Sequence, residues 1–507
     1  QQRFPEWYCF FPKSFSLRTD GKALDDYFRS LKGKVKTFVM KPNTGCEGKG
    51  ILLTRNPMKV AKTLPDQDYI VQLYVHRPLL IEGKKFDMRV YVLMTFSGSS
   101  ESFDGRRFAC DGDTWWLDTN GSSMNPVTTS TSPTTAAGGG LQIFIHREGL
   151  VRICSEAYAK PTADNLKDVY KHLTNYALNK KNEHYVFAGG EGGAGDETPA
   201  PQGSSDDENE NEESIHCDLG YEGDGSEGYT SNKRDFRFLS EYINRNGMGI
   251  PEVRHEWSKA SPGAAATVGA DDDDDTAAAS NSGGLTEGQD DTLPDETLWT
   301  TLSKRIDRAV VLSVLSGVRE VKQAYHAAGA LSGPRADGRN GFELMGFDVM
   351  LTQSGHVHVL EINHSPSLFC DTPLDVRVKK TVAKDTMRIV TRGVPDIRKC
   401  SDYGYKRHVE KLKRSEVDPP FAAKGTQFRQ CFPLPCSPHP SAPASSAWAA
   451  FASQVPLTEQ YLLDRKYCES EMAIYRSVWN ATSGMESCSS GIGNVSKTVV
   501  AEAIRSG

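Results

Sequence analysis

The sequence predicts an α+β fold, because runs of β-branched and aromatic residues alternate with segments of helical spacing along the chain. Polar stretches rich in Gly, Ser, Asp and Glu separate these blocks. At roughly 150 residues per domain, the 507 residues are enough for two to four structural units. Charged residues recur at the ends of the expected strands, and we expect function to reside there.

The expected strands are short apolar runs bounded by turn residues. They are residues 35–40, 51–53, 69–74, 88–96, 141–146, 150–154, 346–351 and 357–362. The turn at residues 147–149 predicts a hairpin between 141–146 and 150–154. A second hairpin is expected around the turn at residues 353–355, between the last two strands.

Helices are expected where apolar residues return at intervals of three or four positions. Within residues 298–326, side chains such as Leu302 and Val310 share one face. Residues 376–390 and 459–479 also have helical spacing.

Three segments lack apolar periodicity, namely residues 97–140, 188–231 and 251–297. Their polar composition cannot bury enough apolar surface to offset the entropy lost on ordering, so we expect flexible insertions. The third contains five consecutive aspartates at 271–275. This run lacks the glycine and the spaced ligands of an EF-hand loop, which favours a spacer over a calcium site.

The charge distribution predicts an acidic partner. The net charge is −7, but residues 190–231 hold 13 acidic and no basic residues, and residues 260–297 hold 10 acidic and no basic residues. The rest of the chain has 59 basic against 43 acidic residues, a net charge of +16. A positive body attracts polyanions. Charge alone leaves nucleic acid, an anionic membrane and an acidic protein tail open.

Composition excludes some protein classes. The longest apolar runs, such as residues 90–96, are far shorter than the roughly 20 residues that span a bilayer, which excludes a transmembrane helix. The 11 cysteines include no CxxC pair and no compact disulfide pattern, as expected in a reducing, intracellular compartment. The chain opens with Gln1 rather than Met, and nothing near it reads as a signal peptide.

The first candidate site is the glycine-rich loop at residues 41–50, directly after one expected strand and before another. Glycines let the backbone approach phosphate groups closely, and backbone amides and the Lys41 ammonium group supply positive charge. The loop lacks the Walker A spacing and does not lead into a helix. A phosphate-binding loop and a plain hairpin turn with two lysines are both compatible with this pattern.

Three oxygen-bearing side chains are expected to converge at the second hairpin. Asp348 lies within an apolar strand, where an unpaired carboxylate is costly. Glu361 and Asn363 are two residues apart on the next strand and therefore point to the same face. Carboxylates completed by water and phosphate oxygens suit magnesium. The alternative is a structural salt bridge from Asp348 to Arg89 or Lys379.

Charged side chains also share one face of a single expected strand. With a period of two, Lys85, Asp87 and Arg89 point to one side and Phe86 points to the other. Such a face requires a polyanionic ligand, pairing among the charges, or an exposed edge strand.

Six motifs occur in a fixed order along the chain. They are Lys41 with its glycine-rich loop, residues 72–75, 85–89, 172–176, 346–348 and 360–367. Together they resemble the tubulin tyrosine ligase-like family, an ATP-grasp group of amino-acid ligases. The resemblance runs from about Phe4 to Arg388 with the three insertions excluded. The ending at 363–367 (Asn-His-Ser-Pro-Ser) resembles the polyglutamylase branch of that family.

The resemblance implies a fold and a domain organisation. The fold would be ATP-grasp, within the α+β class, with its N-terminal portion cut short. Residues 1–390 would form the catalytic domain, carrying the three insertions described above. Residues 391–507 would form a basic, partly disordered extension and a candidate microtubule-binding region.

The resemblance also implies roles for individual residues. The ATP site would comprise Lys41, Glu47, Gly48, Gln72, Leu73, Tyr74, Val75, Lys85, Phe86, Asp87, Thr174 and Asn175. The incoming glutamate would contact Arg152, Tyr176, Lys233 and Lys379. The magnesium ligands would be Asp348, Glu361 and Asn363. The catalytic residues would be Arg89, near the transferred phosphate, and Arg152. Glu47 stands where the family usually has glutamine, which places a carboxylate beside a polyphosphate.

The implied activity is the ATP- and Mg²⁺-dependent addition of glutamate to glutamate side chains of tubulin tails, through an acyl phosphate. The implied partners are tubulin or microtubules and free L-glutamate, with no nucleic acid, no membrane and a monomeric protein. The implied location is the cytoplasm and cytoskeleton, including the cilium or flagellum. A tubulin glycylase of the same fold and a non-catalytic microtubule-binding protein remain alternatives.

A basic segment follows the last motif. Residues 377–414 hold 13 basic and 4 acidic residues, a net charge of +9. The functional interpretation is a docking surface for the acidic microtubule lattice, as the family resemblance implies. The alternative is a solvated basic helix and tail.

Overall fold

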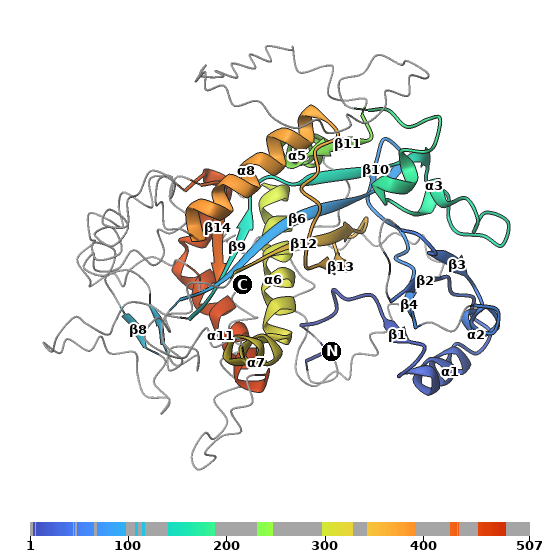
Figure 1. Cartoon of the computed structure of the whole chain (residues 1–507), viewed down its shortest axis with the longest axis horizontal. Helices are drawn as coiled ribbons and strands as arrows, with labels where there is room; N and C mark the ends of the chain where they lie inside the picture. Colours follow the sequence, from blue (N-terminus) through green and yellow to red (C-terminus); the bar gives the residue numbers. More distant parts are fainter. Residues whose placement is uncertain are drawn as a thin grey trace, which may run out of the picture.

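Two β-sheets of unequal size organise the molecule (Figure 1). In the described part of the chain, the larger sheet has eight strands and the smaller has four. The computed structural model describes residues 4–5, 7–43, 45, 48–64, 68–97, 107–109, 114–116, 140–187, 231–246, 297–327, 342–390, 426–432, 434 and 455–482. This is the α+β architecture that the sequence predicts.

The larger sheet is built around β6 (Lys84–Ser97), a strand of 14 residues. Its other strands are β5 (Leu80–Ile81), β9 (Gly140–His146), β10 (Leu150–Ala157), β11 (Lys233–Asp235), β12 (Phe342–Leu351), β13 (Val357–Asn363) and β14 (Phe428–Phe432). All of their pairings are antiparallel, in the order β11-β10-β6-β12-β13, with β9 between β6 and β14. β6 is an internal strand of this sheet. An exposed edge strand therefore does not explain the charged residues on its face.

One of the two expected hairpins is confirmed and the other is wrong. β12 and β13 pair around the turn at residues 353–355. β9 and β10 instead both pair with β6, β9 along its second half and β10 along its first half. The residues that connect β9 to β10 run close to the backbone of β6. A Cβ on Gly149, one of these residues, would lie 2.4 Å from the Arg89 carbonyl oxygen. A strand as long as β6 can accept two consecutive partners on the same edge.

The smaller sheet has the strand order β1-β4-β2-β3. These strands are β1 (Ser14–Ser16), β2 (Phe38–Pro42), β3 (Leu52–Thr54) and β4 (Tyr69–Leu73). Helices α1 (Gly21–Ser30) and α2 (Pro57–Ala61) pack against it, and Leu24 of α1 joins Phe38 and Val71 in a separate apolar core. This sheet therefore has a core of its own beside the larger one.

The two faces of β6 have different surroundings. Side chains such as Met88 and Val92 point into the main core, where they meet α6 (Leu298–Ser316). Tyr91 and Leu93 point the other way, into a second apolar cluster with α8 (Pro373–Val390). Lys85, Asp87 and Arg89 continue this second face toward the start of β6. The same face is thus apolar under α8 and charged beyond it.

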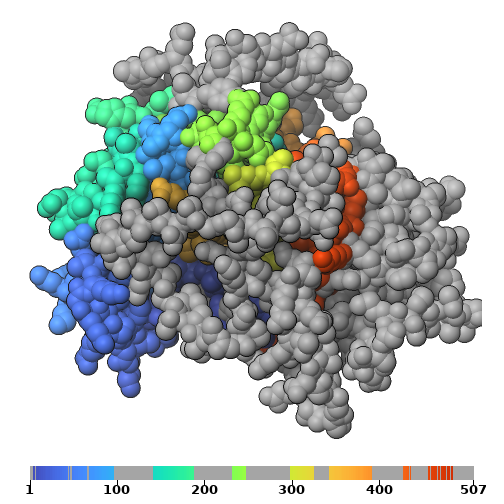
Figure 2. Space-filling view, turned by 180° about the vertical axis from the view of Figure 1, so that it is seen from behind, coloured from blue at the N-terminus to red at the C-terminus, as the bar shows by residue number. Residues whose placement is uncertain are grey.

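The remaining helices cover the sheet and flank the start of β6. They are α3 (Val169–His172), α4 (Tyr176–Asn179), α5 (Phe236–Asn246), α7 (Val318–Ala327), the 3₁₀ helix η4 (Leu457–Leu462) and α11 (Arg465–Thr482). The helix expected over 298–326 is divided at Gly317 into α6 and α7. Seen from behind, α5, α6 and residues 455–482 lie next to one another on the surface (Figure 2).

The C-terminal part differs from the extension expected after residue 390. β14 adds a strand to β9, and α11 packs against α6 in the main core. Two ion pairs with buried carboxylates join these parts: Arg429 lies 2.6 Å from Asp307, and Arg147 lies 2.8 Å from Glu459. Residues 426–482 therefore belong to the same folded unit in their described portions. The basic residues between 391 and 414 lie outside the described residues.

The expected insertions fall largely outside the described residues. Within 97–140, the strands β7 (Arg107–Ala109) and β8 (Thr114–Trp116) form a small hairpin that was not expected from the sequence. The ends of the second insertion are joined, because the Asn232 amide donates to the Val186 carbonyl (3.0 Å) and Asn232 Oδ1 accepts from the Val186 amide (2.8 Å). Among the described helices, none is long and apolar enough to cross a membrane.

Candidate active site

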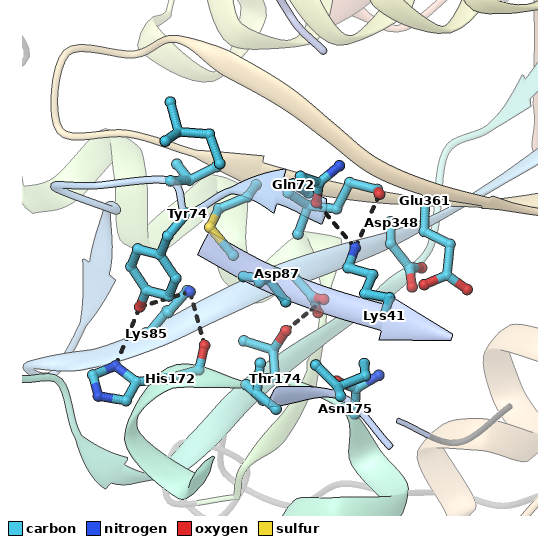
Figure 3. Close-up of a pocket in the computed structure, with 17 residues that line it drawn as sticks. Lys41, Gln72, Tyr74, Lys85, Asp87, His172, Thr174, Asn175, Asp348 and Glu361 are labelled. Atoms are coloured by element: carbon cyan, nitrogen blue, oxygen red, sulfur yellow. Dashed lines mark hydrogen bonds between the residues drawn. The ribbon is translucent and has the colours of Figure 1, made fainter. Parts of the chain in front are cut away.

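A pocket lies between the two sheets (Figure 3). Loop residues next to α3 and α4 close one side of it. Its lining residues are Val39, Lys41, Ile51, Gln72, Leu73, Tyr74, Val75, Lys85, Asp87, His172, Leu173, Thr174, Asn175, Asp348, Met350, Leu360 and Glu361. A lining that mixes apolar side chains with a few convergent polar groups is typical of small-molecule and cofactor sites.

The two sheets supply opposing apolar walls. Val39 and Leu73 come from the smaller sheet, and Met350 and Leu360 come from the larger one. Polar groups are interspersed between these walls. The arrangement suits a ligand with a flat apolar part and a charged part.

Lys41 leaves β2 and reaches across to the larger sheet. Its Nζ donates to Gln72 Oε1 (3.0 Å) and to the Leu360 carbonyl (3.3 Å). Leu360 is the extra residue of a bulge in β13, which leaves its carbonyl free to accept this bond. Burial lowers the pKa of Lys41, and the nearby carboxylates of Glu361 and Asp348 oppose that shift. Lys41 therefore ties the two sheets together at the pocket.

Lys85 occupies the opposite side of the pocket from Lys41, beside Tyr74 and His172 (Figure 3). Its Nζ donates to the His172 carbonyl (2.8 Å) and to the Tyr74 hydroxyl (3.0 Å). Burial lowers the pKa of Lys85 to about 8, against the opposing influence of Cys154 and Asp87. Because both acceptors are neutral, they do not compensate the positive charge of this ammonium group. An anionic ligand in the pocket could therefore form a charge-assisted hydrogen bond with it.

Four charged side chains form a continuous network, and two of them, Asp87 and Asp348, line the pocket. Arg152 contacts Asp87 (2.6 Å) and Asp348 (2.8 Å), and Arg89 contacts Asp348 (2.6 Å). Thr174 Oγ1 also donates to Asp87 (2.6 Å). Burial alone would raise the pKa of Asp348, but Arg152 and Arg89 lower it to about 2. Burial likewise acts to lower the pKa of Arg152, and Asp348 and Asp87 outweigh it, so that this pKa is raised.

The donor set of Asp348 and Glu361 fits a hard divalent cation. The two residues lie opposite each other on β12 and β13, and their carboxylates point to the same side (Figure 3). Glu361 is exposed to the pocket, whereas Asp348 is buried and already paired with two arginines. Asn363 lies opposite Gly346 and donates to its carbonyl (3.3 Å), outside the pocket lining. Magnesium accepts one or two carboxylates with water and ligand oxygens, which this pair can provide.

A second charged cluster lies one strand away. Lys233 of β11 is opposite Arg152 of β10, and its Nζ lies 2.8 Å from Asp375 and 3.6 Å from the centre of the Tyr176 ring. Lys379 lies 3.0 Å from the same aspartate. The structure therefore brings together three of the residues that the family resemblance placed around the amino acid, around a carboxylate that the sequence did not single out.

Eleven residues expected to contact ATP or metal line the pocket. They are Lys41, Gln72, Leu73, Tyr74, Val75, Lys85, Asp87, Thr174, Asn175, Asp348 and Glu361. Phe86 does not, because its side chain lies on the opposite face of β6 in the main core. Gly48 packs against Asn175 at a φ of +75°, and a Cβ at this position would lie 3.1 Å from the Asn175 side chain. Glu47 lies outside the described residues.

Some pocket residues could not be picked out from the sequence. Val39 and Met350 read as ordinary core positions of strands, because apolar walls carry no signal of their own. His172 belongs to one of the six motifs, but the sequence does not reveal that its carbonyl rather than its ring meets Lys85. Asp375 sits in a basic helix, where an acidic residue resembles a solvated surface charge.

Comparisons with known proteins point to one family. The profile described as the tubulin-tyrosine ligase family matches residues 1–97, 137–192 and 276–399. Tubulin polyglutamylase ttll6 of Danio rerio is 26% identical over 412 residues, which are 81% of this chain and 35% of that protein. Human tubulin polyglutamylase TTLL13 is 26% identical over 411 residues, 81% of this chain and 34% of that protein.

A ciliate protein is similar too. The probable beta-tubulin polyglutamylase of Tetrahymena thermophila is 24% identical over 390 residues, 77% of this chain and 22% of that protein. The chain spans about a fifth to a third of the length of these curated relatives.

Proposed function

Because the chain belongs to the tubulin-tyrosine ligase family, a group of ATP-dependent ligases, we propose that it adds glutamate to glutamate side chains of tubulin tails. It would do so on an ATP-grasp fold, with ATP and Mg²⁺. The relatives from Danio rerio, human and Tetrahymena thermophila are all named as tubulin polyglutamylases, one of them as a probable one. These names support glutamate as the amino acid. The catalytic unit would comprise residues 1–390 together with the described parts of 426–482.

The single observation that carries the proposal is the composition of the pocket between the sheets. Two lysines enter it from different strands, and two carboxylates lie on the side of Lys41. The apolar walls would receive the adenine, with residues 72–75 as the hinge. Lys41 and Lys85 would neutralise the phosphates, and Asp87, Thr174 and Asn175 would complete the nucleotide site.

The chemistry requires no nucleophilic side chain from the protein. The acceptor carboxylate attacks the γ-phosphorus of ATP, so that ADP leaves and an acyl phosphate forms. The amine of free glutamate then attacks the acyl carbon, and phosphate leaves as the amide bond forms. Arg89 would face the transferred group, and the cluster of Arg152, Tyr176, Lys233 and Lys379 would hold the amino acid. Magnesium, bound by Asp348 and Glu361 with Asn363, would supply charge neutralisation at the phosphates.

The proposal is tested by mass spectrometry of tubulin tails. Purified protein is incubated with tubulin, Mg²⁺, ATP and either glutamate or glycine. We expect added glutamate residues that depend on ATP, and none without it. Incorporation of glycine alone would identify a glycylase, and no incorporation with intact nucleotide binding would favour a non-catalytic microtubule-binding protein.

The proposed addition of glutamate to tubulin tails also implies which partners the protein has and where it acts. The acceptor would be an acidic tubulin tail, and the positive charge of the body outside the acidic insertions would favour its approach. The protein would act on the cytoskeleton, including axonemal microtubules. Nucleic acid, membranes and a second copy of the chain are not required.

Nucleotide affinity is expected to fall as the pH rises above about 8. The pKa of Lys85 is about 8, so its ammonium group is charged below that pH and neutral above it. One pH unit beyond the pKa, the loss of charge should weaken ADP binding by up to about tenfold. Calorimetric titrations at pH 7 and pH 9 measure this change. Lys85→Met should bind ADP weakly at both pH values and should lose the part of the pH dependence that Lys85 causes. An equal pH dependence in both proteins would contradict the assignment.

A further inference from the structure

We propose that Asp375 is a positioning residue for the amino-acid substrate, holding Lys233 and Lys379 side by side as one receptor for one of its carboxylate groups. The inference rests on the proposed function, because it concerns the amino-acid side of that site. Asp375 lies in the first turn of α8 and is completely buried. A carboxylate without any exposure needs partners that account for its charge.

The contacts of Asp375 come from three directions. Its Oδ2 accepts from Lys233 Nζ (2.8 Å) and from Thr372 Oγ1 (2.8 Å), and its Oδ1 lies 3.0 Å from Lys379 Nζ. The Thr372 hydroxyl oxygen in turn accepts from the Asp375 amide (3.2 Å). One carboxylate thereby fixes two ammonium groups that belong to a distant strand and to the next turn of its own helix.

The two lysines have further contacts that limit their positions. Lys233 lies over the ring of Tyr176, at 3.6 Å from the centroid. Lys379 donates a hydrogen bond to the Phe369 carbonyl. Both side chains are nearly buried, at 5% and 9% exposure of the whole residue. Little freedom is left for either ammonium group except near Asp375.

Neighbouring strands of the larger sheet connect this cluster to the proposed nucleotide site. Lys233 is opposite Arg152, and Arg152 is opposite Asp87, which lines the pocket. Tyr176 directly follows Asn175, another lining residue. An amino acid held at Lys233 and Lys379 would therefore lie beside the nucleotide.

The charges of the cluster leave room for one more carboxylate. Two ammonium groups face the single negative charge of Asp375. Asp371 also acts on Lys233, but it is itself matched by Lys180 at 4.0 Å. The unbalanced positive charge fits a carboxylate of the substrate, and charge-assisted hydrogen bonds of this kind are shorter and stronger than neutral ones.

The competing explanation is purely structural. An acidic residue at the third position of a helix commonly takes part in capping its first turn. Asp375 would then stabilise α8 and have no influence on substrate binding. The two explanations differ in kinetics, because a capping role changes stability but not the Michaelis constant of one substrate.

The test is Asp375→Asn, which keeps the size and removes the charge. Initial rates are measured against glutamate at saturating ATP, and against ATP at saturating glutamate. We expect KM for glutamate to rise by about tenfold or more, with KM for ATP changed less than about twofold. Thr372→Val, which removes one partner of the carboxylate, should raise KM for glutamate less and serves if Asp375→Asn does not fold.

The matched control is Asp385→Asn on the same helix. Asp385 is also buried, and its Oδ2 accepts from the Gln427 amide (2.7 Å) rather than from the cluster. This variant should lose stability without any change in KM for glutamate. An equal loss of stability in both variants, with wild-type KM in both, would overturn the proposal.

The pH dependence provides a second readout that capping does not affect. Burial lowers the pKa of Lys233, and Asp375 counteracts this, while Lys379, Asp371 and Tyr176 are the other groups that face it. Without the Asp375 charge the lysine should lose its proton at lower pH. As the pH is raised, KM for glutamate should therefore begin to rise at a lower pH in Asp375→Asn than in the wild type. Parallel profiles would count against the proposal.

Failure of the proposed function can be told apart from failure of this inference. If the wild type incorporates no glutamate, the function fails. The receptor is then tested by calorimetry with glutamate and the ADP-bound protein. Binding that is weakened in Asp375→Asn supports the inference, and absent or equal binding in the two proteins overturns it.

Discussion

Replacing Glu361 by glutamine is expected to lower the rate of ligation about a thousandfold while leaving the fold intact. Glu361 is exposed at the pocket, so that the core does not depend on it. The change removes one carboxylate charge from the proposed magnesium site and keeps the size of the side chain. Without it, the phosphates would no longer be correctly placed and neutralised in the transition state.

The measurement is glutamate incorporation by Glu361→Gln, with circular dichroism to verify folding. Glu343→Gln is a suitable control, because Glu343 lies on β12 opposite Met94, far along the strand from Asp348. It should retain wild-type activity. Near-normal turnover by folded Glu361→Gln would refute the metal assignment.

Asp348→Asn is expected to abolish activity and to destabilise the protein by about 3–5 kcal/mol. Asp348 is the common partner of Arg89 and Arg152, and all three side chains are buried or nearly so. Asparagine leaves these two guanidinium groups with only part of their compensating charge. The free energy of unfolding in urea at pH 7 measures the loss.

The pH dependence of this stability has a definite sign. The pKa of Asp348 is lowered to about 2 in the folded protein, from an ordinary value of 3.8. Its stabilising contribution, about 2–3 kcal/mol, is therefore present above the unfolded pKa and is lost as the pH falls toward 2. Asp348→Asn should lack this part of the acid destabilisation.

A matched control separates stability from chemistry. Asp307 is also a buried aspartate, and it pairs with Arg429 and accepts from the Tyr461 hydroxyl (2.7 Å) in the main core. Asp307→Asn should destabilise the protein to a similar extent, while its folded fraction keeps wild-type activity. If Asp348→Asn behaves in the same way, the Asp348 network is structural only.

Local patterns predicted the elements better than their pairing. The hairpin of β12 and β13 follows from a short turn between two apolar runs and is confirmed. The pairing of β9 and β10 with β6 depends on the length of β6, and no pattern in residues 141–154 encodes it. Gly317 divides the expected long helix, although apolar periodicity continues through Val318. Such breaks and pairings are decided by the tertiary structure.

In the site too, the sequence predicted which side chains share one strand face, but not every partner that comes from another strand. A period of two placed Lys85, Asp87 and Arg89 on one face, and the structure bears this out. The salt bridge from Arg89 to Asp348 was one of two interpretations of that aspartate, and it is present. The second partner, Arg152, could not be foreseen, because it arrives from β10 across β6.

The pairing of β14 with β9 matters for anyone who expresses a shortened protein. A polypeptide that stops at Val390 would leave the β9 edge open, with unpaired amide and carbonyl groups that recruit strands from other molecules. It would also uncover the side of α6 on which α11 packs, where Arg308 donates to Glu471 (2.9 Å). Soluble, monodisperse material should therefore require the chain through Thr482, and aggregation of shorter versions would say nothing about the catalytic residues.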